Sequence, residues 1–273
     1  MDPDIAAHYA LGLEADRLFT WGRLERLRTE ALLERHLPSP PATVLDVGGG
    51  PGAYALWLAR RGYAVHLIDP IELHVAQARE TSARQPDAPL ASIELGDARA
   101  LDADDRAADV VLLLGPLYHL PDSGDRARAL REALRVLRPG GVLAAAAISR
   151  FAATLDGLLK GALDDPAFEA IVERSLRDGR HRNPERRPEW FTTAFFHLPG
   201  ELEDEVRAAG FALEALVAVE GVGAILADPD AWLDDPTRRA TLMRAIARVE
   251  SEPSLLGASP HLLAVGRRPD RTE

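Results

Sequence analysis

Residues 43–70 of this 273-residue chain read TVLDVGGGPGAYALWLARRGYAVHLIDP. The apolar run Thr43–Val47 predicts a strand, and the glycines within residues 48–52 predict a tight turn into a helix. A second apolar run, Ala64–Ile68, predicts another strand, which ends at Asp69. Glycines in such a turn let the backbone approach a ligand, and free N–H groups at the helix start face that ligand. An acid about twenty residues later is well placed to hold ribose hydroxyls, so the segment predicts a nucleoside-binding βαβ unit.

The glycines alone are compatible with two kinds of nucleoside cofactor. Residues 48–53 fit the dinucleotide pattern G-x-G-x-x-G/A, so they do not exclude NAD. Together with Asp46, the same stretch fits D-x-G-x-G-x-G and resembles motif I of the class I S-adenosylmethionine (SAM)-dependent methyltransferases. A dinucleotide brings a pyrophosphate, whereas SAM brings an ammonium, a carboxylate and a sulfonium. An acid in the loop repels the pyrophosphate and suits a cationic ligand, which favours SAM.

Later motifs follow in the order typical of this family, and the resemblance is close over residues 32–150. An acid after the third strand accepts a hydrogen bond from the adenine amino group in the family, which implies this role for Asp97. The fourth strand is almost continuously apolar, as a buried parallel strand should be. In chain order, the motifs are strand Ser92–Leu95 with Gly96-Asp97-Ala98, strand Asp109–Leu114 with the turn Gly115–Leu120, and helix Arg126–Leu137 with the turn Arg138-Pro139-Gly140-Gly141 before strand Val142–Ile148.

Composition predicts a cytoplasmic enzyme that acts on neither nucleic acids nor membranes. The formal net charge of -11 disfavours a nucleic-acid substrate, because a phosphate backbone requires a basic groove. No stretch approaches the roughly twenty apolar residues needed to span a bilayer, and the acidic N-terminus lacks the basic start of a secretory signal. The chain has no cysteine, which excludes disulfides, thiolate metal sites and cysteine nucleophiles.

The whole chain predicts an α/β fold of the Rossmann-like, doubly wound type, with a seven-stranded sheet whose last strand is antiparallel. Residues 210–219 and 261–266 supply the sixth and seventh strands. Long segments beside the carboxyl ends of strands usually carry function, so we expect helical lids there. The expected parts are an N-terminal helical lid over 1–40, a SAM-binding core over 41–150, a lid or substrate insertion over 151–198, and the rest of the core over 199–273 with a helical insertion at about 221–260.

The resemblance also implies which residues hold the cofactor. The glycines would cradle the methionine end of SAM with help from Asp46, Asp69 would bind the ribose, and Tyr9 would contact SAM from the N-terminal lid. No metal is expected. The implied cofactor-binding residues are Asp46, Gly48, Gly49, Gly50, Gly52, Asp69, Pro70, Asp97, Ala98, Gly115 and Tyr9.

Candidates for the catalytic residues follow from position in the chain. His119 comes after the fourth strand, where the family places substrate, and Tyr118 beside it would orient the acceptor. His197 precedes the helix expected at 199–209, and Glu220 ends the sixth strand. Each also has a purely structural interpretation as a capping, packing or solvated side chain, and the sequence does not choose between them.

Two further features also have both a functional and a structural interpretation. The run 180–187 (RHRNPERR) can attract an acidic substrate or form a solvated loop. The aromatic residues that follow it can line a substrate pocket or pack inside the insertion; they are Trp190, Phe191, Phe195 and Phe196.

The predicted function is therefore methyl transfer from SAM to an oxygen or nitrogen of a small-molecule acceptor, with S-adenosylhomocysteine (SAH) as the product. The alternatives are an NAD-dependent oxidoreductase and a SAM-binding protein that does not methylate. The sequence neither predicts nor excludes a homodimer.

Overall fold

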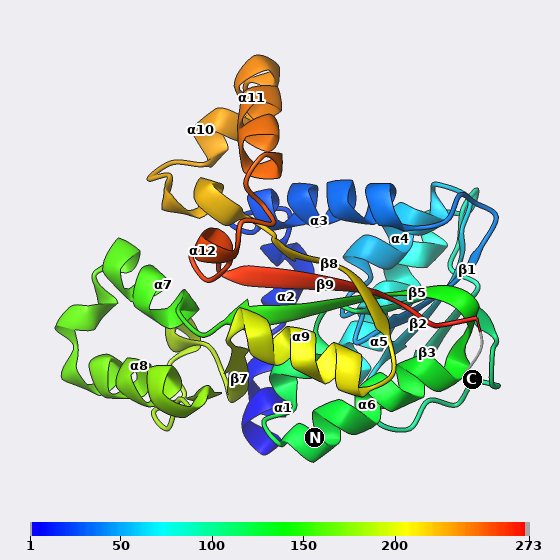
Figure 1. The fold of residues 1–273 in the computed structure, drawn as a ribbon, viewed down its shortest axis with the longest axis horizontal. Coiled ribbons are helices and arrows are strands. Elements are labelled where there is room, and N and C mark those ends of the chain that lie inside the picture. Colours follow the sequence, from blue (N-terminus) through cyan, green and yellow to red (C-terminus); the bar gives the residue numbers. More distant parts are fainter. Residues whose placement is uncertain (1, 271–273) are drawn as a thin grey trace.

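The apolar runs form one sheet in the computed structural model, which describes residues 2–270 (Figure 1). Its parallel part has the order β3-β2-β1-β4-β5. Strand β9 pairs with β5 in the antiparallel direction and with β8 on its other side, so the predicted fold class is confirmed. The core strands are β1 Thr43–Val47, β2 Ala64–Asp69, β3 Ser92–Leu95, β4 Ala108–Leu113, β5 Leu137–Ser149, β8 Ala212–Ala218 and β9 His261–Arg267.

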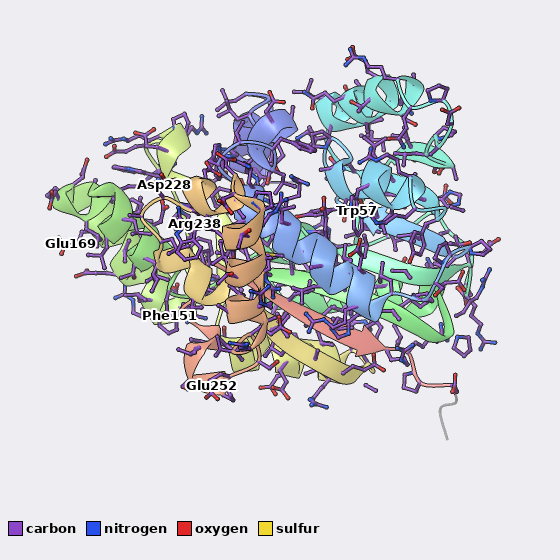
Figure 2. All side chains as sticks on the ribbon, turned by 90° about the horizontal axis from the view of Figure 1, so that it is seen from above. Trp57, Phe151, Glu169, Asp228, Arg238 and Glu252 are labelled. Carbon is purple, nitrogen blue, oxygen red and sulfur yellow. The ribbon has the colours of Figure 1, made fainter. Side chains whose placement is uncertain are left out.

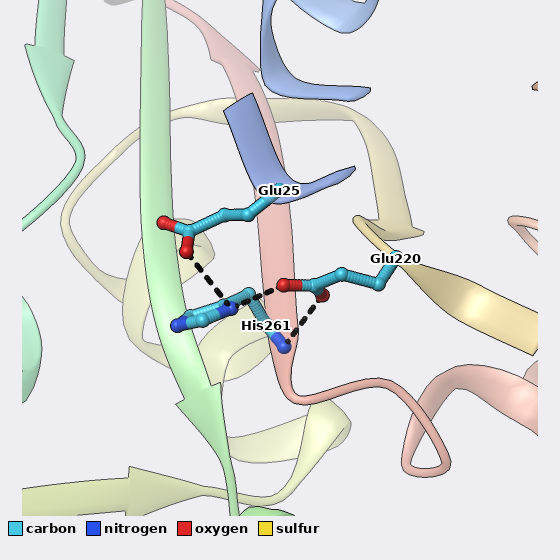
Figure 3. A group of neighbouring side chains, drawn as sticks. All are labelled: Glu25, Glu220 and His261. Atoms are coloured by element: carbon cyan, nitrogen blue, oxygen red, sulfur yellow. Dashed lines mark hydrogen bonds and ion pairs between the residues drawn. The ribbon is translucent and has the colours of Figure 1, made fainter. Parts of the chain in front are cut away.

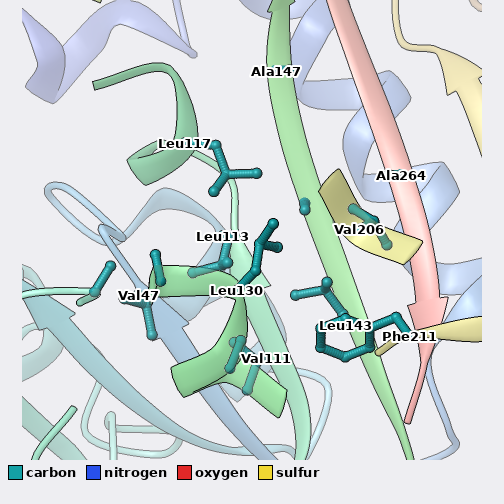
Figure 4. Close-up of a cluster of buried hydrophobic side chains, with 14 of the residues drawn as sticks. Val47, Val111, Leu113, Leu117, Leu130, Leu143, Ala147, Val206, Phe211 and Ala264 are labelled. Carbon is teal, nitrogen blue, oxygen red and sulfur yellow. The ribbon is translucent and has the colours of Figure 1, made fainter. Parts of the chain in front are cut away.

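Side chains of the central strands alternate between two hydrophobic layers, because successive residues of a strand point to opposite faces. In β4, Val110 and Leu112 belong to one layer, whereas Val111 and Leu113 belong to the other. Figure 4 shows the layer that contains Val111 and Leu113. Both faces of the sheet are therefore covered. Helices α3 Arg23–His36, α4 Ala53–Ala59 and α5 Glu72–Ala83 cover the first face, and α6 Ser123–Val136 and α9 Pro199–Ala208 cover the second.

The predicted turn at residues 138–141 is part of a strand. Leu137 pairs with Ala108 and Val142 pairs with Val110, and the register shifts between these two pairs. Gly140 has a φ of +74° there, which a glycine adopts without strain. The LRPGG segment is therefore an irregular stretch within β5 that follows α6 directly.

The insertion at 151–198 contains helices and also a short pair of strands that the sequence did not predict. Strand β7 runs parallel to the end of β5, and β6 pairs with β7. Trp190 and Phe196 pack in a core of this insertion with Phe168, which favours the packing interpretation of these aromatic residues. The elements are α7 Ala152–Lys160, η2 Ala162–Asp164, α8 Pro166–Asp178, β6 Arg180–His181, η3 Pro188–Trp190 and β7 Ala194–His197.

Two arginines of the basic run form ion pairs on the surface. Arg186 pairs with Asp4 of the N-terminal helix α1 (Pro3–Tyr9), and Arg187 pairs with Asp165 and Glu189. These charges are therefore satisfied within the chain, and they link the insertion to the N-terminal segment.

The second insertion packs on the N-terminal part of α3. Leu24 of α3 contacts a small core that contains Leu233 and Ile246, and Arg23 pairs with Asp230 and Asp234. Seen from above, Asp228 and Arg238 of this insertion lie between Glu169 of α8 and Trp57 of α4 (Figure 2). The elements are η4 Gly221–Ile225, α10 Asp230–Leu233, α11 Pro236–Ala247 and α12 Pro253–Leu256.

Among residues 2–270, no helix is long and apolar enough to cross a membrane.

Candidate functional site

One large cavity opens where the parallel strands end. Its volume is about 890 Å³, close to the upper end of the range of about 300–1,000 Å³ for small-molecule sites. The wall on one side comes from the glycine loop and from three acids: Asp46 within β1, Asp69 at the end of β2 and Asp97 after β3. The wall on the other side comes from α1, from α2 (Glu14–Arg17), from η1 (Pro116–His119) and from the start of β9.

Most of the expected site residues meet in this cavity. Gly52 does not line it, because this residue is the cap of α4 and packs against Leu67 below the loop. The expected residues in the wall are Tyr9, Asp46, Gly48, Gly49, Gly50, Asp69, Pro70, Asp97, Ala98, Gly115, Tyr118 and His119.

Two glycines of the loop, Gly48 and Gly49, lie too close to their neighbours to carry side chains. Gly48 has a φ of +68°, and a Cβ added there would lie 2.7 Å from Cγ of Pro116. A Cβ on Gly49 would lie 2.7 Å from Oδ2 of Asp46. The loop therefore leaves bare backbone facing the cavity, as close approach to a ligand requires.

Asp46 lies beneath this loop and is only 1% exposed. Its Oδ2 atom has no hydrogen-bond partner among the described residues. Burial, together with the nearby charge of Asp69, raises the pKa of Asp46 to about 7, although a hydrogen bond from the backbone of Ala55 opposes this shift. A buried acid that lacks a partner is costly to ionise, and a cation placed beside it would relieve that cost.

Asp69 ends β2 and holds the loop from the other side. Its Oδ2 accepts the N–H of Gly50 at 2.8 Å, and its Oδ1 accepts the N–H of Ile71 at 2.9 Å. The Nδ1 atom of His74 lies 3.1 Å from the same Oδ1, while Nε2 of His74 is buried without a partner among the described residues. Each carboxylate oxygen can accept more than one hydrogen bond, so Asp69 keeps capacity for a ligand.

The predicted adenine-binding acid is held in a fixed orientation. Asp97 accepts hydrogen bonds from the side chain of Arg99 at 2.6 and 2.9 Å, and Arg99 also pairs with Asp125 of α6. The hydrogen bond from Arg99 holds the pKa of Asp97 below its usual value, so this acid is ionised at neutral pH.

Tyr9 and His119 contact each other in the wall formed by α1 and η1. The hydroxyl of Tyr9 lies 2.5 Å from Nε2 of His119, and Nδ1 of His119 lies 3.4 Å from the carbonyl oxygen of Thr193. A carbonyl only accepts, so we assign the ring proton to Nδ1 and the Tyr9 hydroxyl as the donor to Nε2. Burial lowers the pKa of His119 to about 4, which keeps the imidazole neutral.

Tyr118 lies next to this pair but its hydroxyl points elsewhere. The hydroxyl donates to the carbonyl oxygen of Leu114 at 3.1 Å, and burial raises the pKa of Tyr118 above its usual value. Its ring packs edge-on against the ring of His119, with 4.8 Å between the centroids. Tyr118 therefore shapes the cavity wall with its ring.

Two other candidate bases lie outside the cavity wall. His197 is fully buried behind Phe195, and its Nε2 lies 3.4 Å from Glu205 of α9. Burial lowers the pKa of His197. Glu220 is 6% exposed and contacts His261, which does line the cavity.

Several polar residues of the cavity wall escaped the sequence analysis or received no role in it. Arg17 donates to Glu14 at 2.8 Å and to Glu25 of α3 at 2.5 Å. A Cβ on Gly50 would lie 3.9 Å from Cγ of Glu14, so this ion-pair group sits beside the glycine loop. His74 and His261 are also in the wall, and no local motif marks either of them.

Comparison with known proteins finds similarity to methyltransferases over part of the chain. Residues 44–141 match the family described as a methyltransferase domain. The chain is 38% identical over 148 residues to the methyltransferase GfsG of Streptomyces halstedii, which is 53% of this chain and 48% of that protein. It is 37% identical over 125 residues to the ubiquinone biosynthesis O-methyltransferase of Paramagnetospirillum magneticum, covering 46% of this chain and 47% of that protein. The matches thus span about half the length of these curated relatives.

A solved structure shares the fold over nearly the whole chain. The putative methyltransferase of Haloferax volcanii, determined in complex with the Trm112 methyltransferase activator, superposes with a TM-score of 0.63. The likeness covers 98% of this chain and 99% of that one at 19% sequence identity. At that identity, the likeness concerns the fold.

Proposed function

We propose that this chain, which belongs to the class I SAM-dependent methyltransferases, transfers a methyl group from SAM to an oxygen or nitrogen of a small molecule. The observation that carries the proposal is the large cavity, in which a cofactor-type wall faces a separate polar and aromatic wall. An enzyme that brings two small molecules together needs both walls in one enclosed space.

Two features of the cofactor-type wall fit SAM. Beneath the bare loop, Asp46 has a buried oxygen without a partner among the described residues, and it lies where a cationic group would lower its free energy. Asp69 and Asp97 are positioned by their own hydrogen bonds and retain acceptor capacity for ribose and adenine. Arg17, beside the loop, offers a guanidinium for the carboxylate of the methionine end.

Bound SAM supplies an activated methyl group, so the main contribution of the protein is proximity and orientation, worth up to about 7–11 kcal/mol. Tyr9, Tyr118 and His119 enclose the far side of the cavity and exclude water from it. Because the Tyr9 hydroxyl occupies Nε2 of His119, we assign this pair to closing and shaping the acceptor side. His197 has no role in the proposal, since Glu205 and Phe195 surround it away from the cavity.

Isothermal titration of the purified chain with SAH and with NADH tests the cofactor assignment. We expect micromolar binding of SAH and no binding of NADH. Asp69→Ala should weaken SAH binding, whereas replacing the exposed Asp87 by Asn should not. Binding of NADH instead of SAH would refute the assignment and favour the oxidoreductase alternative. Binding of SAH without methyl transfer to any acceptor would favour the non-methylating alternative.

The other expectations from the sequence stay predictions: a small-molecule acceptor, no resident metal and a cytoplasmic location. The sequence neither predicts nor excludes a homodimer. Size-exclusion chromatography with light scattering measures the oligomeric state directly.

A further inference from the structure

A partly buried histidine at the start of β9, His261, connects three elements of the fold. Nδ1 of His261 lies 2.6 Å from Oε1 of Glu220, at the end of β8, and 4.0 Å from Oε2 of Glu25, on α3 (Figure 3). Glu220 also accepts the hydroxyl of Ser259 at 3.0 Å and the backbone N–H of His261 at 3.1 Å. Because a carboxylate accepts hydrogen bonds, Glu220 fixes the ring and places a proton on Nδ1.

The other ring nitrogen of His261 is free for a ligand. Figure 3 shows Nε2 pointing away from both carboxylates. Within residues 2–270, Nε2 makes no hydrogen bond, and His261 forms part of the cavity wall. The neighbouring wall residues Ala146, Val219 and Leu263 are apolar. His261 thus presents Nε2 to the cavity beside these apolar side chains.

The charges around His261 make it a stronger base than His119. Burial alone would lower the pKa of His261, but Glu220 and Glu25 outweigh this and raise the pKa to about 9. Arg17 opposes them from the side of α2, and the nearby Tyr118 is uncharged at neutral pH because burial raises its pKa. A phenol has a pKa of about 10, so a proton moves between a phenol and this imidazole at little cost.

We infer that His261 binds the hydroxyl of the acceptor and takes its proton, and that the acceptor carries an acidic hydroxyl of the phenol or enol class. This inference rests on the proposed function. The acceptor proton passes to Nε2, and the oxygen electron pair forms the bond to the methyl carbon. The pair of the broken carbon–sulfur bond stays on sulfur, which leaves SAH and an imidazolium. Glu220 is a positioning residue, because it acts through His261.

Glu25, Glu220 and His261 are also close enough to bind a divalent metal ion, since their ligand atoms lie within 4.8 Å of one another. Arg17 donates to both oxygens of Glu25, at 2.5 and 3.1 Å, and would repel a second cation there. Both carboxylate oxygens of Glu220 already accept hydrogen bonds, from Ser259 and His261. The two carboxylates therefore balance the positive charge that forms when His261 takes up a proton, without a metal ion.

Three variants test the inference: His261→Asn, Glu220→Gln and, as a matched control, His66→Asn. His66 lies on β2 outside the cavity wall, where it contacts Ser92. The probes are 4-methylphenol, cyclohexanol and benzylamine with methyl-labelled SAM, and SAH affinity is measured in parallel. We expect methylation of the phenol only. His261→Asn should lower kcat/KM by about 10²–10⁴-fold, with SAH affinity within about threefold of the unchanged protein.

The pH profile separates His261 from a merely structural residue and from His119. In the unchanged protein, kcat/KM should rise about tenfold per pH unit up to about pH 9. Glu220→Gln removes a negative charge, so this limb should shift to lower pH, which ionisation of the phenol itself would not do. A profile that is flat above pH 5 would indicate His119 instead.

The outcomes separate a failure of the proposed function from a failure of the role given to His261. If the unchanged protein does not bind SAH, the proposed function itself is refuted. If it binds SAH but methylates cyclohexanol or benzylamine, or leaves the phenol unmethylated, the acceptor class is refuted while the cofactor assignment stands. Unchanged turnover in His261→Asn, or loss of activity on addition of EDTA, overturns the role given to His261.

Discussion

Replacing Asp46 by Asn should stabilise the ligand-free protein at alkaline pH and weaken its binding of SAH. The pKa of Asp46 is raised from 3.8 to about 7, which corresponds to about 4 kcal/mol at about 1.36 kcal/mol per pH unit. The folded protein holds this proton more tightly than the unfolded chain does. The contribution of the protonated Asp46 carboxyl to stability is therefore fully present below about pH 4 and is lost as the pH rises to about 7.

Between pH 5 and pH 8, this linkage removes about 3 kcal/mol from the free energy of unfolding of the unchanged protein. An asparagine side chain cannot ionise, so Asp46→Asn avoids that loss. We therefore expect the two proteins to differ in stability by about 3 kcal/mol more at pH 8 than at pH 5. Urea unfolding at both pH values measures the difference, and Asp87→Asn serves as the control because Asp87 is exposed.

The same carboxyl should make SAH binding depend on pH. A bound ammonium favours the ionised form of Asp46, so the ligand-free protein must release a proton when it binds SAH below pH 7. Affinity should therefore be about tenfold weaker at pH 6 than at pH 8, and Asp46→Asn should abolish this difference. Titration calorimetry in buffers of different ionisation enthalpy counts the proton. An equal stability gain at pH 5 and pH 8, or pH-independent SAH binding by the unchanged protein, would refute the reasoning.

Three further variants should behave differently from one another. Asp69→Ala should weaken SAH binding by about 1–3 kcal/mol, since two backbone N–H groups of the site lose their acceptor; titration calorimetry measures this. Gly48→Ala should lower the melting temperature and SAH affinity together, because its Cβ would lie 2.7 Å from Pro116; an unaffected variant would mean that the loop adjusts. His119→Ala should reduce turnover with little effect on SAH affinity, because it frees the Tyr9 hydroxyl on the acceptor side, and steady-state kinetics test this.

The sequence predicted that the glycine loop, Asp69 and Asp97 meet at one cavity because this part of the wall is built from local segments, and the role of these residues in binding a cofactor stays a prediction. Each motif there is a strand, a turn and the start of a helix, so spacing along the chain determines position in space. β1 and β3 have the predicted bounds, and the loop and Asp69 lie next to each other as expected. The LRPGG segment was harder to place, since a bulge within β5 and a turn before it require the same glycine conformation.

The polar residues of the cavity that belong to no motif could not be predicted in this way, because they come from distant parts of the chain. Arg17 and Glu25 belong to the N-terminal helices, whereas His261 lies on the last strand. No spacing rule connects these positions, and an arginine or histidine alone carries no signal. His197, in contrast, was a candidate base from its place before a helix, but in the fold its side chain lies against Glu205 and outside the cavity wall.

The two sides of the cavity fit a reaction that moves a positive charge from one to the other. Methyl transfer removes the charge at the sulfonium, which we propose binds on the side of Asp46 and Asp69. When the acceptor proton reaches His261, an equal charge forms between Glu220 and Glu25. The net charge of the enclosed space is then unchanged, and carboxylates flank the charge at its start and at its end. Such an arrangement lowers the barrier because its charges are already in place before the reaction, so little reorganisation is needed. Neutralising Glu220 should therefore slow the chemical step more than it weakens acceptor binding.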